Sequence, residues 1–256
     1  MEYKFISAKC ITYGRVGVLE EAVSSFLQQD YPQDKCELIV VNDYPLQELK
    51  LPFEVPNIKI YNLDKTFETI GEKENYAIER CKGDIIAVWD DDDVALSNHL
   101  SNINKYWKEN SNLLHWGKGV YYNEPNITAI TSLGNSGIVY SKRAWEEIGR
   151  SPLENAGGDM TLVNKLHELG RDNIIIASPD DVDVSWYYRW ALPSDQIYHQ
   201  SGLGNDVEGK PNVIQRHSAH VERLRQEGKI PTGVVTLYPQ WKQDYKQLLI
   251  NYLKEK

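Results

Sequence analysis

A run of apolar residues that leads directly into four consecutive carboxylates constrains this chain more than any other feature. The apolar run covers residues 85–89 (Ile-Ile-Ala-Val-Trp), and Asp90 to Asp93 follow it. An unbroken run of this length is typical of a strand buried on both faces in the middle of a mostly parallel sheet. Such a strand cannot carry charge inside, so the carboxylates must emerge at its C-terminal end. In open α/β sheets this edge is where ligands bind.

The four carboxylates predict a metal and phosphate site. Like charges in a row repel one another, which raises their pKa values or requires a cation between them. Carboxylate oxygens are hard ligands that suit Mg²⁺ or Mn²⁺. An acidic turn in water is the simpler alternative, but solvated turns rarely follow so apolar a strand directly. An EF-hand calcium loop does not fit, because counting from Asp90 places Ala95 and Ser101 where that loop needs glycine and glutamate.

Length and composition are ordinary for a soluble globular protein. The chain has 256 residues, of which 41% are hydrophobic and 25% charged, which suits one domain with a C-terminal extension. The net charge of −9 argues against a broad surface that coats nucleic acid. The cysteines lie in apolar segments and predict reduced core thiols. No apolar stretch is long enough to span a membrane and the N-terminus lacks a signal-peptide core, so we expect a cytoplasmic location.

Strands and helices alternate along the first half of the chain. The predicted elements are strands at residues 4–12, 36–41, 58–63 and 85–89, with helices at 18–27 and 72–81. This alternation predicts an α/β fold with a mostly parallel, doubly wound, Rossmann-like sheet. Polar residues should therefore collect at the C-terminal edge of that sheet.

The second half is less regular. We expect strands at residues 135–140, 174–177 and 184–189, and helices around 100–107 and at 142–148, 159–169, 213–227 and 239–253. Residues 110–126 are mixed and aromatic and favour no assignment. Residues 194–209 are polar and punctuated by glycine, which predicts a lid over the site.

Several motifs, in this order and spacing, resemble family 2 glycosyltransferases. Thr12-Tyr13-Gly14-Arg15 looks like the opening motif of that family, and residues 40–43 (Val-Val-Asn-Asp) resemble its second-strand acidic tip. Residues 71–77, followed by residues 83–93, are similar to the stretch that ends in the family's Asp-x-Asp motif. Gly158-Asp159 resembles the position of the catalytic base. The resemblance covers roughly residues 3–200.

The resemblance implies the GT-A fold. Residues 1–205 would form the glycosyltransferase domain, with a nucleotide-binding half at 1–95 and an acceptor-binding half at 96–205. Residues 206–256 would form a C-terminal helical extension. The implied function is metal-dependent transfer of a sugar from a nucleotide-sugar, a UDP-sugar in our interpretation, to an acceptor hydroxyl with inversion of the anomeric carbon.

Charge that develops on the leaving diphosphate explains why such an enzyme needs a cation. Carboxylates can hold Mn²⁺ or Mg²⁺ where that charge appears. We expect Asp92 to be the direct ligand and Asp90 to contact the ribose or the metal through water. Asp93 would orient its neighbours. Asp91 is a further nucleotide-sugar-binding candidate, although an extended chain would turn its side chain away.

The remaining nucleotide-sugar-binding candidates lie near the ends of the first strands. Asp43 could accept a hydrogen bond from the base, although an acidic residue before Tyr-Pro also suits an ordinary turn. Thr12 and Tyr13 could line the same pocket. Arg15 and Lys73 are candidates for the diphosphate, while a solvated helix face is the alternative for Lys73. Asn75 completes this set; many relatives have arginine where this chain has Glu74.

Two further residues have candidate roles opposite the nucleotide. Asp159 would deprotonate the acceptor hydroxyl, although a carboxylate in the first turn of a helix also stabilises the helix without chemistry. His199 stands in the predicted lid, and relatives often close the metal site with a histidine from this region. A lone histidine in a polar loop is more often simply exposed.

A local reversal of charge in residues 210–229 bears on the acceptor. Arg216, Arg223 and His220 fall near one face of the predicted helix. This face could dock an anionic acceptor, such as a phosphate-bearing glycan, a lipid-phosphate or modified DNA. A solvated helix with clustered charges is the alternative.

Two other functions are consistent with the sequence. One is a sugar nucleotidyltransferase of related fold, but residues 14–17 contain too few glycines for its phosphate-binding loop. The other is a catalytically silent module that binds a carbohydrate or a nucleotide.

Overall fold

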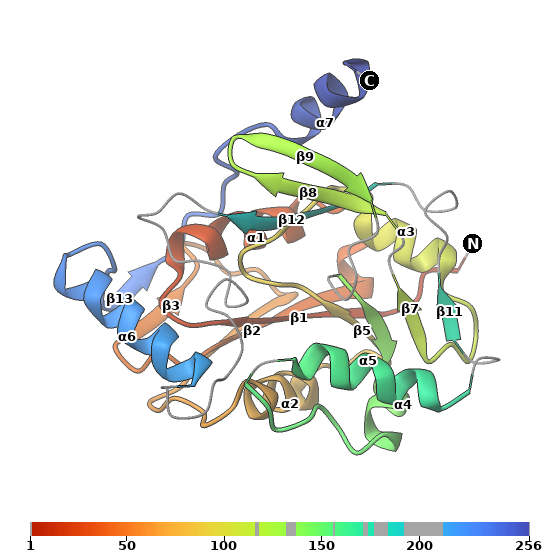
Figure 1. The fold of residues 1–256 in the computed structure, drawn as a ribbon, viewed down its shortest axis with the longest axis horizontal. Coiled ribbons are helices and arrows are strands. Elements are labelled where there is room, and N and C mark those ends of the chain that lie inside the picture. Colours follow the sequence, from red (N-terminus) through yellow and green to blue (C-terminus); the bar gives the residue numbers. More distant parts are fainter. Residues whose placement is uncertain are drawn as a thin grey trace.

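The computed structural model describes residues 2–115, 118–131, 137–155, 157–170, 174–176, 184–191 and 212–255. Its central feature is a seven-stranded sheet with the order β11-β7-β10-β5-β1-β2-β4 (Figure 1). The strands are β1 (Ile6–Thr12), β2 (Cys36–Asn42), β4 (Ile58–Asn62), β5 (Ile85–Val88), β7 (Leu113–His115), β10 (Val139–Ser141) and β11 (Ile174–Ile176).

The sheet is mostly parallel. Strand β1 lies between β2 and β5 and is parallel to both, and β4 extends the parallel set beyond β2. Strand β10 is antiparallel to its neighbours β5 and β7. Every residue of β2 and β5 is buried, as their unbroken apolar sequences require of strands covered on both faces. The structure thus confirms the predicted α/β sheet.

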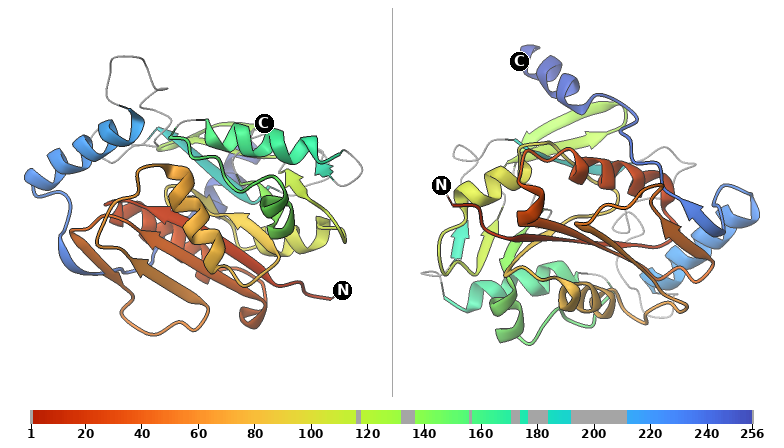
Figure 2. Two further views of the ribbon diagram at one scale, coloured as in Figure 1. Left: turned by 90° about the horizontal axis from the view of Figure 1, so that it is seen from below. Right: turned by 180° about the vertical axis from the view of Figure 1, so that it is seen from behind.

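Helices cover both faces of the sheet (Figures 1 and 2). On one face α1 (Val16–Leu27) and α3 (His99–Tyr106) pack through Leu19, Phe26 and Ile103 against alternate strand residues such as Leu38 and Ala87. The opposite face carries α2 (Ile70–Arg80), α4 (Lys142–Glu147) and α5 (Gly158–Glu168). Successive residues of a strand point to opposite faces, which is why β2 and β5 contribute to both cores.

A second, four-stranded sheet has the order β6-β12-β8-β9. Its strands are β6 (Val94–Ala95), β8 (Gly119–Asn123), β9 (Asn126–Thr131) and β12 (Trp186–Ala191). Strand β6 begins directly after Asp93 and pairs with β12. This second sheet therefore abuts the turn formed by residues 90–93 (the acidic turn). Its strand β8, with β7 of the central sheet, lies within residues 110–126, for which the sequence pattern favoured no assignment.

The C-terminal region is not purely helical. Between α6 (Val213–Gln226) and α7 (Tyr245–Lys254) lies β13 (Gly233–Thr236), which pairs in parallel with β3 (Gln47–Lys50). The sequence pattern predicted no strand at residues 47–50, because strand pairing with a segment so distant in sequence leaves no local signal. A short 3₁₀ helix precedes β2 at Gln33–Lys35. Within the described ranges no helix is both long and apolar enough to cross a membrane.

The C-terminal region packs at two places. Val221 and Leu224 of α6 are buried against Tyr44, just beyond β2. Gly14 makes this approach possible: its φ is +70°, and a Cβ there would lie 2.8 Å from Cγ1 of Val221. At the other place Tyr245 of α7 donates a hydrogen bond of 2.8 Å to Glu21 of α1. The region is therefore built into the body of the protein.

Candidate active site

The acidic residues after β5 form a turn in which the backbone N–H of Asp93 donates to the carbonyl of Asp90 over 3.3 Å. The extended conformation ends before this turn, so side chains no longer alternate between the two faces. Asp91 does not point away, contrary to expectation: its side chain is buried and paired with Arg15. Asp92 is buried beside it.

Arg15 holds the acidic turn together. Its Nε donates to Oδ2 of Asp91 over 3.0 Å, a second guanidinium nitrogen pairs with the same carboxylate, and Nη1 donates to Oδ2 of Asp92 over 2.8 Å. Burial opposes the charged guanidinium, but the two carboxylates outweigh it and raise the pKa of Arg15. Arg15 was expected to bind the diphosphate; here its fork neutralises the turn from the N-terminus of α1.

Asp90 occupies a different environment. No described residue donates a hydrogen bond to its carboxylate, and the nearby cation is Lys9, a buried residue of β1 that pairs with Glu74. Burial raises the pKa of Asp90 to about 7 against the opposing effect of Lys9, and Asp92 and Asp91 add to the rise. Glu74 thus joins Lys9 near Asp90.

Asp93 fixes the turn to β12. Its carboxylate accepts hydrogen bonds from Nε1 of Trp186 over 3.0 Å and from the backbone N–H of Arg189 over 2.9 Å. The side chain of Arg189 donates to the carbonyl of Asp92 and forms a buried ion pair of 2.5 Å with Glu21. Asp93 therefore has the contacts of a residue that orients its neighbours.

Asp43 and Lys73 form a buried ion pair at the end of β2. The ammonium of Lys73 also donates to the carbonyl of Thr12 over 2.6 Å, and Asp43 accepts from the backbone N–H of Phe67 over 3.1 Å. Lys73 lies in the first turns of α2, which begins with a capping box between Thr69 and Glu72. The ion pair and the burial of Lys73 exclude a solvated helix face.

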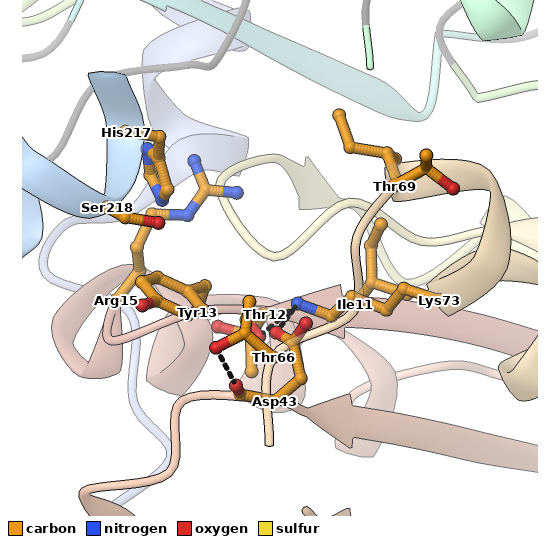
Figure 3. A pocket seen from close by; sticks show the side chains of 11 residues that line it. Ile11, Thr12, Tyr13, Arg15, Asp43, Thr66, Thr69, Lys73, His217 and Ser218 are labelled. Carbon is orange, nitrogen blue, oxygen red and sulfur yellow. Dashed lines mark hydrogen bonds and ion pairs between the residues drawn. The ribbon is translucent and has the colours of Figure 1, made fainter. Parts of the chain in front are cut away.

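A cleft that is open to solvent lies above this ion pair (Figure 3). It is lined by Ile11, Thr12, Tyr13, Arg15, Asp43, Thr66, Thr69, Ile70, Lys73, His217 and Ser218. Five of these were predicted to bind the donor from the sequence: Thr12, Tyr13, Arg15, Asp43 and Lys73. The ends of β1 and β2 form its floor, α2 forms one side, and α6 forms another.

His217 is one of the cleft residues that sequence reasoning did not identify. It is 4% exposed, and its ring centroid lies 5.7 Å from that of Tyr13. Burial, with the cations Arg15 and Lys73, lowers the pKa of His217 to about 3, so the ring is neutral. A signal was present in the sequence: His217 shares a helix face with the apolar residues Val221 and Leu224, at spacings of four and seven.

Asn75 lies outside the cleft. Its amide donates to the carbonyl of Ser151 over 3.0 Å, while its oxygen accepts from Nε1 of Trp145 and from the backbone N–H of Ser151. These bonds fasten α2 to α4 and the following loop. The structure thus gives Asn75 packing contacts, and its expected contact with the donor stays a prediction.

Asp159 lies in the first turn of α5 and is exposed. The loop before this helix docks on the start of α2: the N–H of Ile70 donates to Oδ1 of Asn155 over 3.2 Å. A Cβ on Gly71 would lie 1.8 Å from the carbonyl oxygen of Pro152, so only glycine permits this docking. This contact joins the loop that precedes Asp159 to α2, the helix that carries Lys73. His199 and the predicted lid at 194–209 lie outside the described residues.

The acidic turn has the donor chemistry of a magnesium or manganese site. Within the part of the chain that the structure describes, no three His, Cys, Asp or Glu side chains converge on one point. Mg²⁺ is commonly held by one or two carboxylates, with substrate phosphates and water completing its shell. Asp90, whose carboxylate accepts no hydrogen bond from the described residues, and Asp92, whose Oδ2 accepts from Arg15, are the two carboxylates that would hold such an ion.

The basic residues after position 210 are largely compensated. Arg223 pairs with Glu227 over 2.9 Å, Arg225 pairs with Glu222, and Lys229 approaches Glu227 to 3.0 Å. These are exposed pairs along one helix and its C-terminal turn. They favour a solvated helix over an acceptor-docking face.

Comparison with known proteins identifies relatives of this arrangement. Residues 10–157 match the family model described as Glycosyl transferase family 2. No curated protein sequence matches the chain.

Solved structures share the fold. S. aureus TarS 1–349 matches with a TM-score of 0.54 and 17% identity, over 72% of this chain and 60% of that chain. Its complex with UDP-GlcNAc gives a TM-score of 0.56 and 15% identity, over 74% and 60%. The mannosyltransferase PcManGT from Pyrobaculum calidifontis, in complex with GDP-Man and Mn²⁺, gives 0.55 and 13%, over 90% and 73%. The chain thus spans less than two thirds of the TarS chains that it matches.

Proposed function

This chain belongs to glycosyl transferase family 2, and from that premise we propose that it transfers a sugar from a UDP-sugar to an acceptor hydroxyl. The observation that carries the proposal is the cleft over the Asp43–Lys73 ion pair, with Arg15 linking it to the acidic turn. A nucleotide-sugar needs two adjoining sites. The nucleoside needs fixed polar groups, which the cleft supplies, and the diphosphate needs a site whose carboxylates are balanced by positive charge, which the acidic turn with Arg15 supplies.

The floor of the cleft suits the nucleoside part of the donor. Lys73 fixes the Asp43 carboxylate, and each carboxylate oxygen retains capacity for a further hydrogen bond from the base. Tyr13 supplies an aromatic face beside it. Two of the similar TarS structures hold UDP-GlcNAc or UDP, which supports uridine as the nucleoside.

The acidic turn suits the diphosphate through a divalent cation. Asp92 would be a direct ligand and Asp90 a second, direct or water-bridged, with Mn²⁺ or Mg²⁺ between them and the diphosphate. The cation supplies positive charge where the leaving group becomes more negative. Arg15 balances the charge of Asp91 and Asp92, and Asp93 keeps the turn against β12. The similar mannosyltransferase structure, which holds Mn²⁺, supports this assignment.

Asp159 is the proposed general base. Its carboxylate takes the proton from the acceptor hydroxyl as that oxygen forms a bond to the anomeric carbon, and the bond from that carbon to the diphosphate breaks. A direct displacement by one base inverts the anomeric carbon. Exposure of Asp159 supports this role, because an acceptor from solvent can reach it.

Release of a nucleoside diphosphate tests the proposal. Purified protein with Mn²⁺ is incubated with separate nucleotide-sugars, with and without hydroxyl acceptors, and the products are measured by mass spectrometry. We expect UDP release from a UDP-sugar and a faster release once a suitable acceptor is added. Binding of the donor with no release under any acceptor would favour the silent binding module, and release of pyrophosphate from a nucleoside triphosphate would favour the nucleotidyltransferase.

A further inference from the structure

Helix α6 contributes to the cleft although it lies outside the family-matched residues. The match ends at residue 157, whereas α6 covers Val213–Gln226 and brings His217 and Ser218 to the cleft (Figure 3). The floor of the cleft therefore belongs to the matched region, and one of its walls does not.

The position of α6 is fixed by packing. Val221 and Leu224 are 0% and 1% exposed against Tyr44, and Gly14 supplies the close approach. The side-chain amides of Asn212 and Gln215 form a capping box at its start, each accepting a hydrogen bond from the backbone N–H of the other. Since apolar packing on both turns after His217 anchors the helix, the imidazole has a defined place over the floor.

The imidazole of His217 has no hydrogen-bond partner among the described residues, although the side chain is almost fully buried. Because His217 lines the cleft, its ring nitrogens can be satisfied by a ligand that occupies the cleft. Tyr13 packs against one side of the ring at a tilt of 56°. The two rings touch, so they form a single wall and leave no room for a base between them.

We propose that His217 binds the nucleoside part of the donor, by a hydrogen bond from the wall that it forms with Tyr13 over the Asp43–Lys73 floor. This inference rests on the proposed function, and it adds a specificity-determining residue from the C-terminal region. The nucleoside is the part that fits, because a neutral imidazole among Arg15 and Lys73 offers a directional hydrogen bond and adds no charge for phosphate. The C-terminal region then takes part in binding the nucleotide-sugar donor.

Calorimetric titration of the full chain with UDP tests the inference. His217→Ala should weaken UDP binding about tenfold, the loss expected for one hydrogen bond to a ligand with its desolvated partner. His217→Asn, which keeps a donor and an acceptor, should recover part of that loss. His220→Ala is the matched control: the same change one turn along α6, at a residue that contacts Arg223 and does not line the cleft. UDP affinity should be unchanged there, and circular dichroism checks that each variant is folded.

Titration with UMP separates the nucleoside from the diphosphate. A contact to the nucleoside predicts the same factor of loss for UMP and UDP in His217→Ala. A loss seen with UDP alone would place His217 at the β-phosphate and overturn the inference.

The inference and the proposed function fail differently. If wild-type protein binds UDP and Lys73→Met loses it while His217→Ala does not, the inference is wrong and the proposed function stands. If wild-type protein binds neither UDP nor UMP, both are wrong.

Discussion

Asp43 and Asp159 are both carboxylates of the proposed site, yet they lie in opposite surroundings. Asp43 is 3% exposed, paired with Lys73 and bonded to the backbone of Phe67. Asp159 is exposed, and within the described residues its carboxylate has no hydrogen-bond or ion-pair partner. The contrast matches two tasks: a group that positions a donor must be fixed, whereas a base must meet an incoming acceptor and change its protonation.

The surroundings of Asp43 and Asp159 also determine how much each carboxylate contributes to the stability of the fold. Breaking a buried ion pair leaves a charge without water or partner, which costs several kcal/mol. An exposed carboxylate is solvated in either state and contributes little to stability. Mutations on the floor of the cleft should therefore affect folding and donor binding, and mutations at the rim should affect turnover.

The largest effect is expected at the acidic turn. Asp92→Asn removes a ligand charge without a change in size, and transfer should fall by about 10³-fold or more. A chelator should have a comparable effect on the wild-type enzyme, reversed by Mn²⁺ or Mg²⁺. The rate of UDP release measures both, with Asp34→Asn, an exposed acidic residue before β2, as the control. Full activity in protein shown to be metal-free would remove the metal from the proposal.

Asp91 sharpens that test. An extended strand would have made Asp91→Asn mild. Because its carboxylate instead takes two guanidinium contacts from Arg15, we expect Asp91→Asn to lower both stability and transfer. Wild-type behaviour in this variant would show that the Arg15 contacts do not hold the turn.

The next effect concerns the floor of the cleft. Lys73→Met leaves Asp43 buried without its cation and should lower the free energy of unfolding by about 3–5 kcal/mol. Glu147→Gln is the control for an exposed pair, because Glu147 pairs with Arg143 over 3.3 Å with both side chains more than half exposed, and the bond from Arg143 to Asn112 stays in place. That change should cost less than about 1 kcal/mol. Urea denaturation measures both, and equal losses would contradict the contrast between buried and exposed pairs.

At the rim, Asp159→Asn should lower turnover by about 10²-fold and leave UDP affinity unchanged. The carboxylate faces solvent and not the floor of the cleft, so donor binding does not depend on its charge. Glu168→Gln, at the other end of α5, is the control for helix effects. A collapse of UDP affinity, measured by calorimetry, would instead make Asp159 a donor contact or a structural residue.

The smallest effect is on the pH dependence of stability. His99 is fully buried against Trp89 and Trp186. Its Nδ1 lies 2.9 Å from Oγ of Ser185, and burial lowers the pKa of His99 to about 3. The unfolded chain takes up this proton below its ordinary pKa of about 6.5, whereas the folded protein does not. Stability due to His99 is therefore full above pH 6.5 and is lost as the pH falls toward 3.

Lowering the pH from 7 to 5 should cost about 2 kcal/mol through His99. The free energy of unfolding of His99→Gln should fall less steeply over this range than that of the wild-type protein. Parallel slopes for the two proteins would show that His99 protonates in the folded state.

The sequence by itself determined those strands and helices whose burial can be read from the pattern of apolar residues within the element. The apolar runs of β2 and β5 require a sheet covered on both faces, and the period of α2 and α5 requires one buried face. Because parallel strands end at one edge, it also followed that Asp43, Thr12 and the acidic turn lie close together.

Only the tertiary structure decided which partners these residues meet. Several of these contacts join segments that are far apart in the chain: β3 pairs with β13, Asn75 bonds to Ser151, and Arg15 pairs with Asp91. His217 is the clearest case: its local pattern is that of any amphipathic helix, and packing of α6 over Gly14 alone places it in the cleft. A local pattern reports how deeply a side chain is buried, whereas its neighbours are set by long-range contacts that no single stretch of sequence contains.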